Sequence, residues 1–387
     1  MRCARGCAGR CRRPGRSRPF PMCFPMNLLL LSVLTTLPWR VNMRTVFPYR
    51  EHRRRENMMK TAAAVLVGSL LSSAAWADPV TLRLGHAVFE QHPIHDTALR
   101  FKEAVERLSD GDIKIDIFPS RQLGDVKELM EGVQFGTVDM TVNSTSAYST
   151  LEPSIDAFQL PGLIPDYEGF AAMAKTPEAR AIMDRLGNHM MVALGVYDGG
   201  QRHFLTVGAP VESLADMHHK KTRVAPNWMF LDAWQAVGVN PTPMAYGEVY
   251  SALETGTLDA VEINLTSIES EKYYEIAKGV SLTGHYFWPS FLLVNQMKFN
   301  SLTPEQQEIM RQAADEIVEP QVMAVKDLDE QIKAHLAELN IPVVTPSDAF
   351  RAELQAAFAP VVEKYEAADP LIADFAAAAK KLAPAAQ

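Results

Sequence analysis

Cysteine is absent from most of the chain, since the four cysteines are Cys3, Cys7, Cys11 and Cys23. Disulfide bonds and thiol catalysis are therefore excluded for everything that follows. The sequence also has no G-x-S-x-G nucleophile turn, no G-x-G-x-x-G dinucleotide fingerprint and no phosphate-binding loop. These absences argue against the common classes of hydrolase and nucleotide-dependent enzyme. We expect a protein that is not an enzyme and that holds no cofactor.

Basic residues are scarce after position 77. The first 77 residues contain 14 Lys/Arg and 2 Asp/Glu, which leaves 24 basic and 44 acidic residues, a net charge of −20, for residues 78–387. A chain of this charge repels the phosphate backbone of nucleic acids, so we exclude nucleic acid as a partner.

Long apolar runs are also missing. The clearest candidate, Thr61–Ala74, is too short to remain in a bilayer as a spanning helix. It follows the charged start Met58–Lys60 and ends at the small-x-small triplet Ala75–Ala77, a pattern typical of a secretory signal peptide. We predict a signal peptide at 58–77, cleavage after Ala77 and a location in the periplasm.

Residues 1–57 match no folding pattern. We interpret them as a non-native extension that arises from a start codon assigned too far upstream. Their Cys-x3-Cys-x3-Cys run is the alternative, a metal site, which we disfavour.

Residues 221–274 carry the densest pattern in the chain. Strands are predicted at Thr222–Val224, Asn240–Met244 and Leu258–Ile263, with the two prolines of the second indicating an edge position. The helix after the first strand is expected to contain Pro226 in its first turn. Its apolar face has the three- and four-residue spacing of a helix, at Phe230, Trp234 and Val237.

Ligands of such βαβ units bind at the carboxyl ends of the strands, where Arg223 and the Ile263-Asn264 pair lie. A guanidinium group presents a planar fork of donors that matches a carboxylate. We predict that Arg223 grips an anion, with a surface salt bridge as the alternative.

The helix–turn–strand pattern of this stretch occurs twice in the chain. In the first half, a helix start at Gly124–Val126 and a turn into a strand at Gly136–Asp139 place Asn143 at a strand end. In the second half, a helix start at Gly247–Val249 and a turn into a strand at Gly256–Asp259 place Asn264 in the same way. Two similar lobes whose strand ends converge create a cleft between domains, which is a preferred ligand location.

The remaining pattern predicts strands at 80–84, 113–118, 138–142 and 190–196, followed by a flexible point at Asp198–Gly200. Thr303–Gln306 is a capping box that opens a long helical stretch, which Pro320 is expected to kink or divide. The predicted lobes comprise residues 78–200 plus 288–327 and residues 201–287 plus 328–387.

The sequence PTPMAYGEVYSALETGTLD at 241–259, with Arg223-Val224 before it and ESEKYYE after it, resembles the substrate-binding receptors of tripartite ATP-independent periplasmic (TRAP) transporters, the DctP-like family. Leu84–His86 and Gly136–Asp139 look like the opening part of this family. The resemblance implies an α/β, two-lobed periplasmic binding protein fold with an interdomain cleft and a long helix spanning both lobes.

The resemblance also implies site residues. Arg223 falls on the signature arginine that forms a salt bridge with the ligand carboxylate, and Arg202 on a second arginine used for ligand contact. Tyr246 lies where the family places an aromatic ligand neighbour. Asn264 resembles a ligand-contacting asparagine, although Ile263 stands where many members have it.

Two of these assignments compete with structural interpretations. Arg202 fits an ion pair between the lobes as well as it fits a ligand contact, and Tyr246 fits core packing. Asn143 and His86 complete the set of candidate ligand-binding residues. A metal site at His86, His92 and His95 is disfavoured, because no carboxylate or cysteine stands at metal-ligand spacing.

The function that follows is a receptor that captures a small carboxylate, of the sugar-acid or C4-dicarboxylate type, by lobe closure. It delivers this ligand to a permease made of a small and a large membrane subunit, and docks at the membrane without being embedded. The alternatives are a periplasmic sensor domain, or a secreted hydrolase or lyase acting on sugar acids, with a catalytic pair drawn from Glu248, Glu254, Asp259 and Glu262.

Overall fold

A computed structural model describes residues 78–382. The predicted N-terminal extension, signal peptide and cleavage point lie outside the described residues and remain predictions. Within residues 78–382, no helix has both the length and the apolar character that crossing a membrane requires.

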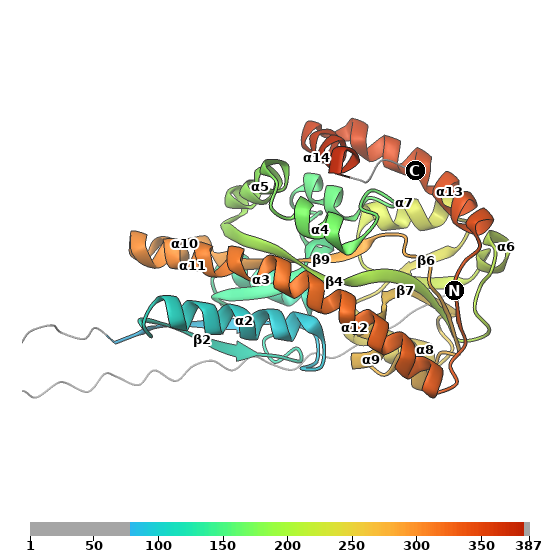
Figure 1. Ribbon diagram of the computed structural model, residues 1–387, viewed down its shortest axis with the longest axis horizontal. Helices are drawn as coiled ribbons and strands as arrows, with labels where there is room; N and C mark the ends of the chain where they lie inside the picture. Colours follow the sequence, from blue (N-terminus) through green and yellow to red (C-terminus); the bar gives the residue numbers. More distant parts are fainter. Residues whose placement is uncertain (1–77, 383–387) are drawn as a thin grey trace, which may run out of the picture. The chain divides into compact units, whose positions relative to one another are not determined.

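One long strand, β4 (Met191–Thr206), is shared by two mixed sheets (Figure 1). Its first part pairs with β9 (Phe287–Asn295), and its last part, from Arg202 onward, pairs with β7 (Ala260–Asn264). The strands follow the order β2-β1-β3-β9-β4-β7-β5-β6. The other strands are β1 (Val80–Gly85), β2 (Ile113–Phe118), β3 (Met140–Ser144), β5 (Lys221–Val224), β6 (Asn240–Pro243), β8 (Gly279–Ser281) and β10 (Val343–Val344).

The two sheets define two lobes. The first lobe is built around β1, β2, β3 and β9, and the second around β5, β6 and β7. Parallel pairs, β1 with β2 and β3 and β5 with β6 and β7, bring strand ends together in each lobe. The expected two-lobed α/β architecture is therefore confirmed, and β6 lies at a sheet edge as its prolines predicted.

The strand predicted at 190–196 is longer than expected, because β4 runs through Asp198–Gly200, the predicted flexible point, to Thr206. The glycines permit an irregularity at which the register with β9 shifts between Asp198 and Gln201. Gly200 has φ +111°, a conformation that side-chain-bearing residues rarely adopt. At Gly199, an added Cβ would lie 1.9 Å from the Trp288 ring. The pair therefore marks the point where one strand passes from the first sheet to the second.

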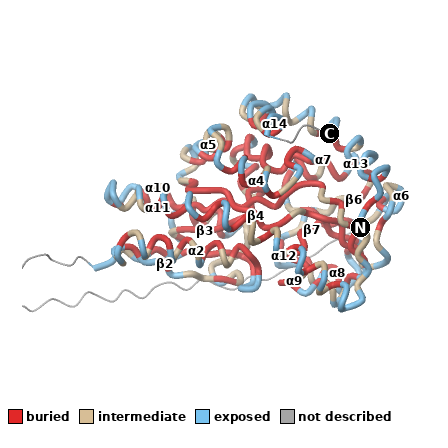
Figure 2. The backbone as a smooth tube through the Cα atoms, in the orientation of Figure 1, coloured by how far each residue is buried: buried red, intermediate tan, exposed pale blue. Residues whose placement is uncertain are grey.

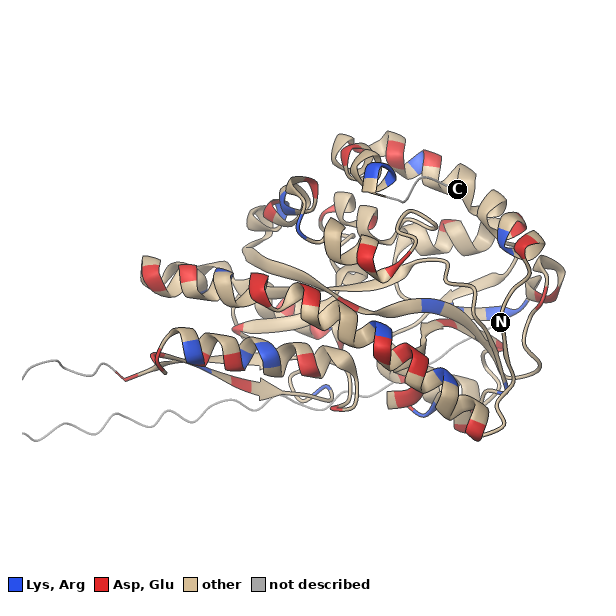
Figure 3. Cartoon of the chain, viewed as in Figure 1, with Lys and Arg blue, Asp and Glu red and all other residues tan. Residues whose placement is uncertain are grey.

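Helices cover both sheets, with their outer faces exposed and the strands largely buried (Figure 2). Figure 3 shows acidic residues along the outer faces of the helices, which accounts for the strong negative charge of this part of the chain. The helices are α2 (Pro93–Leu108), α3 (Val126–Phe135), α4 (Tyr167–Met173), α5 (Pro177–Asp184), α6 (Leu214–Met217), α7 (Trp228–Ala236), α8 (Val249–Glu254), α9 (Leu265–Ser270), α10 (Gln296–Asn300), α11 (Pro304–Glu316), α12 (Val318–Glu338), α13 (Asp348–Ala368) and α14 (Pro370–Leu382).

The long helical stretch after residue 303 spans both lobes, as predicted. Thr303 and Gln306 form the expected capping box at the start of α11. The stretch divides at Ile317, and Pro320 lies in the first turn of α12, where a proline costs no helical hydrogen bond. Helix α12 packs against β4, α2 and α4 and reaches α9 of the second lobe (Figure 1).

The last two helices also connect the lobes. Helix α13 packs on α7 of the second lobe, whereas α14 packs on α4 and α5, which belong to residues predicted for the first lobe. Phe375 of α14 contacts Phe158, with ring centroids 4.8 Å apart. The predicted lobe boundaries, including the assignment of residues 328–387 to the second lobe, stay a prediction.

Candidate functional site

A cavity of about 400 Å³ lies between the lobes. The carboxyl ends of β5 and β7 face α3 and the segment after β3 across it. The residues that line it are Asp125, Val126, Lys127, Glu128, Met130, Ser144, Ser146, Ala147, Thr150, Arg202, Arg223, Ala225, Pro226, Ala245, Tyr246, Asn264 and Trp288. Four of the six predicted ligand-binding residues, Arg202, Arg223, Tyr246 and Asn264, are therefore brought together.

Arg223 is a buried cation near the carboxyl end of β5. It has 3% of its surface exposed, and its Nε and Nη2 donate hydrogen bonds of 3.1 and 2.9 Å to the Met244 carbonyl oxygen. Among residues 78–382 no carboxylate lies within 4.0 Å of it. Burial lowers the pKa of Arg223, the negative charge of Glu262 opposes this shift, and the positive charge of Arg202 adds to it. An anion in the cavity would therefore bind to an unmatched charge.

The turn after β5 keeps Arg223 at the cavity. Pro226 was expected in the first turn of the next helix, but it precedes α7, whose N-cap is Asn227. The Asn227 Oδ1 accepts a hydrogen bond of 3.0 Å from the Phe230 N–H, because an asparagine side chain satisfies a free N–H that proline cannot. Pro226 instead lines the cavity beside Arg223.

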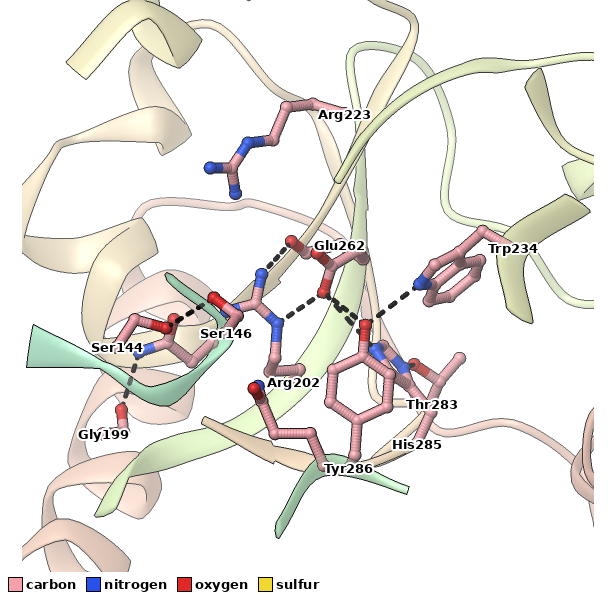
Figure 4. A network of polar contacts seen from close by, with 12 residues as sticks. Ser144, Ser146, Gly199, Arg202, Arg223, Trp234, Glu262, Thr283, His285 and Tyr286 are labelled. Carbon is pink, nitrogen blue, oxygen red and sulfur yellow. Dashed lines mark hydrogen bonds and ion pairs between the residues drawn. The ribbon is translucent and has the colours of Figure 1, made fainter. Parts of the chain in front are cut away.

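Arg202 lines the cavity and also forms an ion pair. Its Nε donates to the Glu262 carboxylate, and its Nη2 donates to the Glu262 carbonyl oxygen at 2.6 Å (Figure 4). Both side chains are buried, at 2% and 0% exposed. The two residues stand on the neighbouring strands β4 and β7, so the alternative of an ion pair between lobes was wrong in its geometry.

Glu262 is the centre of a buried polar network that the sequence did not identify. The Tyr286 hydroxyl donates to its Oε2 at 3.0 Å, and the Trp234 indole N–H donates to the Tyr286 oxygen at 3.0 Å. Burial by itself raises the pKa of Glu262, but the charge and hydrogen bond of Arg202, together with the His285 imidazole 3.8 Å away, lower it to about 2. An acidic residue inside the apolar stretch Ala260–Ile263 was the available signal, because a buried carboxylate requires a partner.

Tyr246 and Asn264 combine cavity contact with internal bonds. The Tyr246 hydroxyl lies 3.1 Å from the Ser267 Oγ, and the Arg121 guanidinium lies 5.1 Å over its ring. The Asn264 Nδ2 donates to the Gly199 carbonyl oxygen at 2.6 Å, while its buried Oδ1 has no hydrogen-bond partner among the described residues. Ile263, the position that raised doubt about Asn264, packs in the hydrophobic core.

Asn143 and His86 do not line the cavity. The Asn143 Nδ2 donates to the Val126 carbonyl oxygen at 2.8 Å, so its amide orders the start of α3. His86 contacts His95, with 2.9 Å between Nε2 and Nδ1, and burial lowers the pKa of His86 to about 3. Across residues 78–382, no group of three or more His, Cys, Asp or Glu could hold a metal ion.

Several hydrogen bonds join the lobes around the cavity. The Gly247 N–H donates to the Asp125 Oδ2 at 2.9 Å, and the Arg121 Nη2 donates to the Glu271 Oε1 at 2.7 Å. Farther along the cleft, the Asn227 Nδ2 donates to the Asp156 Oδ1 at 2.8 Å. These contacts bridge the two lobes beside the cavity. Sequence reasoning missed them, since each pairs residues more than 70 positions apart.

Comparison with known proteins agrees with this geometry. The chain is 29% identical over 291 residues to the 2,3-diketo-L-gulonate-binding periplasmic protein YiaO of Escherichia coli, which covers 74% of this chain and 88% of that protein.

Solved structures are similar over the same region. The sugar acid binding protein DctPAm of Advenella mimigardefordensis, in complex with galactonate, has a TM-score of 0.76 at 27% identity and covers 79% of this chain and 99% of that one. A TRAP periplasmic solute binding protein of Xanthobacter autotrophicus, with bound β-D-galacturonate, has a TM-score of 0.73 at 28% identity and covers 78% and 99%.

The family assignment rests on a match over most of the chain. Residues 84–369 match the model of the DctP family, described as bacterial extracellular solute-binding protein, family 7. The resemblance seen in the sequence motifs is thus confirmed, and the chain belongs to the DctP family of bacterial extracellular solute-binding proteins.

Proposed function

We propose that this protein is the receptor of a TRAP transporter and captures a sugar acid by lobe closure. The observation that carries the proposal is the buried guanidinium of Arg223, which lines a closed cavity without a carboxylate partner among the described residues. A buried charge costs several kcal/mol unless it is paired, so the site is arranged for an anion that arrives from outside. The ligand carboxylate is that anion.

The rest of the cavity favours a ligand rich in hydroxyl groups. Ser144, Ser146, Thr150 and Tyr246 contribute hydroxyls to its wall, and Asn264 contributes an amide. Such groups donate to and accept from sugar hydroxyls, whereas the carboxylates of a C4-dicarboxylate only accept and leave the acceptors of the wall without donors. The ligands named for similar proteins, galactonate, β-D-galacturonate and 2,3-diketo-L-gulonate, are all sugar acids.

The closed arrangement accounts for capture. Charge-assisted hydrogen bonds strengthen when water is excluded, so a ligand that is enclosed by both lobes binds the closed form in preference to the open one. The closed receptor then docks on a permease of small and large membrane subunits in the periplasm. We expect the exported chain to begin at Asp78, which the intact mass of the exported protein tests; a chain that retains Ala77 contradicts this start.

Catalysis is not part of the proposal. Of the acids considered for a hydrolase or lyase, Glu248, Glu254 and Asp259 are exposed, and Glu262 is held by Arg202. Ligand recovered unchanged after prolonged incubation with the protein is the expected result. Conversion of the ligand would favour the hydrolase or lyase instead.

A thermal-shift screen with matched ligands tests the proposed function. Galactonate and galacturonate are expected to raise the melting temperature, since a ligand that binds only the folded state stabilises it. Galactitol, which has the hydroxyls of galactonate but no carboxylate, serves as the control and is expected to have no effect. The proposal fails if no sugar acid stabilises the protein, or if galactitol stabilises it equally.

A further inference from the structure

The buried charges at the cavity do not balance. Arg202 and Arg223 are cations in its wall, and Glu262 is an anion directly behind Arg202 (Figure 4). His203 and His285 lie beside this group, and burial keeps the pKa of both imidazoles below the ordinary value, so both are neutral at pH 7. The interior of the site therefore carries a net charge of about +1.

At the rim of the cavity, the lining residues add one exposed cation, Lys127, and two carboxylates that are exposed or partly exposed, Asp125 and Glu128. Arg121 is paired with Glu271 at 2.7 Å and lies 3.9 Å from Asp125. Lys127 is exposed, with its Nζ 3.8 Å from Glu131. Solvent screens an exposed ammonium group, so it offers a ligand much less than a buried guanidinium does.

From this arrangement we propose that Glu262 is a specificity-determining residue, which cancels the charge of Arg202 and so makes the site select ligands with one carboxylate over ligands with two. The proposal rests on the proposed function and narrows its ligand to monocarboxylic sugar acids. Arg223 binds the single carboxylate. Arg202, still able to donate from the Nη1 that bonds no described residue, binds neutral oxygen atoms of the ligand.

The physical basis is that a second carboxylate would be enclosed without a partner. Closure of the lobes removes the hydration of this second carboxylate. The charge of Arg202 does not compensate, because it is already cancelled by Glu262, which accepts a hydrogen bond from the guanidinium. The first ligand carboxylate and Glu262 would both repel the second carboxylate. This repulsion strongly disfavours a dicarboxylate relative to a monocarboxylate, because the effective dielectric constant of a buried site is about 20, not about 80.

Galactonate and galactarate are the test pair, because they share one six-carbon chain and differ only in whether C6 is a hydroxymethyl group or a carboxylate. Isothermal titration at pH 7.5 is expected to show that the wild-type protein binds galactonate at least about tenfold more tightly than galactarate. Glu262→Gln keeps the side-chain shape and an acceptor for Arg202 but removes the negative charge. In this variant the ratio of the two affinities is expected to move toward galactarate by about tenfold or more.

Tyr286→Phe is the matched control. It removes a hydrogen bond to Glu262 and leaves every charge in place, so the ratio is expected to stay within about twofold of the wild-type value. A change in this ratio would mean that the network acts through its geometry, and the charge argument would be wrong.

The outcomes separate this inference from the proposed function. Binding of neither compound, nor of any other sugar acid in the screen, refutes the proposed function. Equal or tighter binding of galactarate by the wild-type protein overturns the inference alone, and this result does not depend on whether any variant folds. A folded Glu262→Gln protein with an unchanged ratio overturns it as well.

Discussion

Arg121 and Glu271 form an ion pair across the cleft, with 2.7 Å between Nη2 and Oε1, although 150 residues separate them in the sequence. The same guanidinium lies 5.1 Å over the ring of Tyr246, which lines the cavity. Neither Arg121 nor Glu271 lines the cavity itself. The pair therefore favours the closed form of the protein without contacting the ligand.

This relationship predicts a kinetic effect of Glu271→Gln. Loss of the charge weakens the closed form, so the ligand is expected to dissociate about three- to tenfold faster while association changes little. Stopped-flow measurement of both rate constants tests this. Glu330→Gln, which removes an exposed partner of Lys333 on α12, is the control and is expected to leave both rates unchanged. An unchanged dissociation rate in Glu271→Gln would show that the pair does not contribute to closure.

Gly200→Ala is expected to destabilise the fold by about 1–3 kcal/mol. Gly200 has φ +111°, and an added Cβ would lie 3.3 Å from an Asp329 oxygen. Urea unfolding measures the change in free energy. Gly208→Ala is the matched control, since nothing lies within 4 Å of its added Cβ, and a change within about 0.5 kcal/mol is expected. Equal stability of the two variants would contradict the role assigned to Gly200 in β4.

Because Asp329 is buried, we expect the stability of the fold to depend on pH. Burial raises the pKa of Asp329 to about 7 and that of Asp198 well above its ordinary value, and the Tyr167 hydroxyl donates to Asp329. The folded protein therefore keeps a proton that the unfolded chain releases near pH 4. The contribution of Asp329 to stability is complete below that pH and is lost as the pH rises through about 7.

Asp329→Asn removes this titration. Relative to the wild-type protein, the variant is expected to gain stability between pH 5 and pH 8, because an amide does not ionise. Urea unfolding at the two pH values measures the difference. A variant whose stability relative to wild type is the same at both values would show that Asp329 does not titrate in this range.

The local patterns predicted most of the fold. Periodicity predicted strands at 80–84 and 113–118, which correspond to β1 and β2, and the capping box at Thr303 predicted the start of α11. The length of β4 was not predicted. A Gly-Gly pair locally indicates flexibility, and only the pairing of β4 with β9 and β7 shows that the strand continues through it.

The candidate site was predicted where a strand end supplied the side chain, as for Arg223 and Asn264. It was missed where the partner comes from a distant part of the chain. Glu262 is 60 residues from Arg202, and no spacing rule joins them. Asn143 shows the opposite case, since it stands at a strand end as expected but its amide bonds the backbone of α3. Placement at a strand end thus identifies candidates, and packing decides which of them reach the cavity.

Ligand capture depends on the binding of a carboxylate by Arg223, and isothermal titration of Arg223→Gln with the best sugar acid from the screen measures this contribution. The affinity is expected to fall at least about 100-fold, as is usual when one partner of a buried charged pair is removed. Arg351→Gln, at an exposed arginine of α13, is the control and is expected to bind as the wild type does. Binding by Arg223→Gln within about twofold of the wild-type affinity would show that Arg223 does not hold the ligand carboxylate.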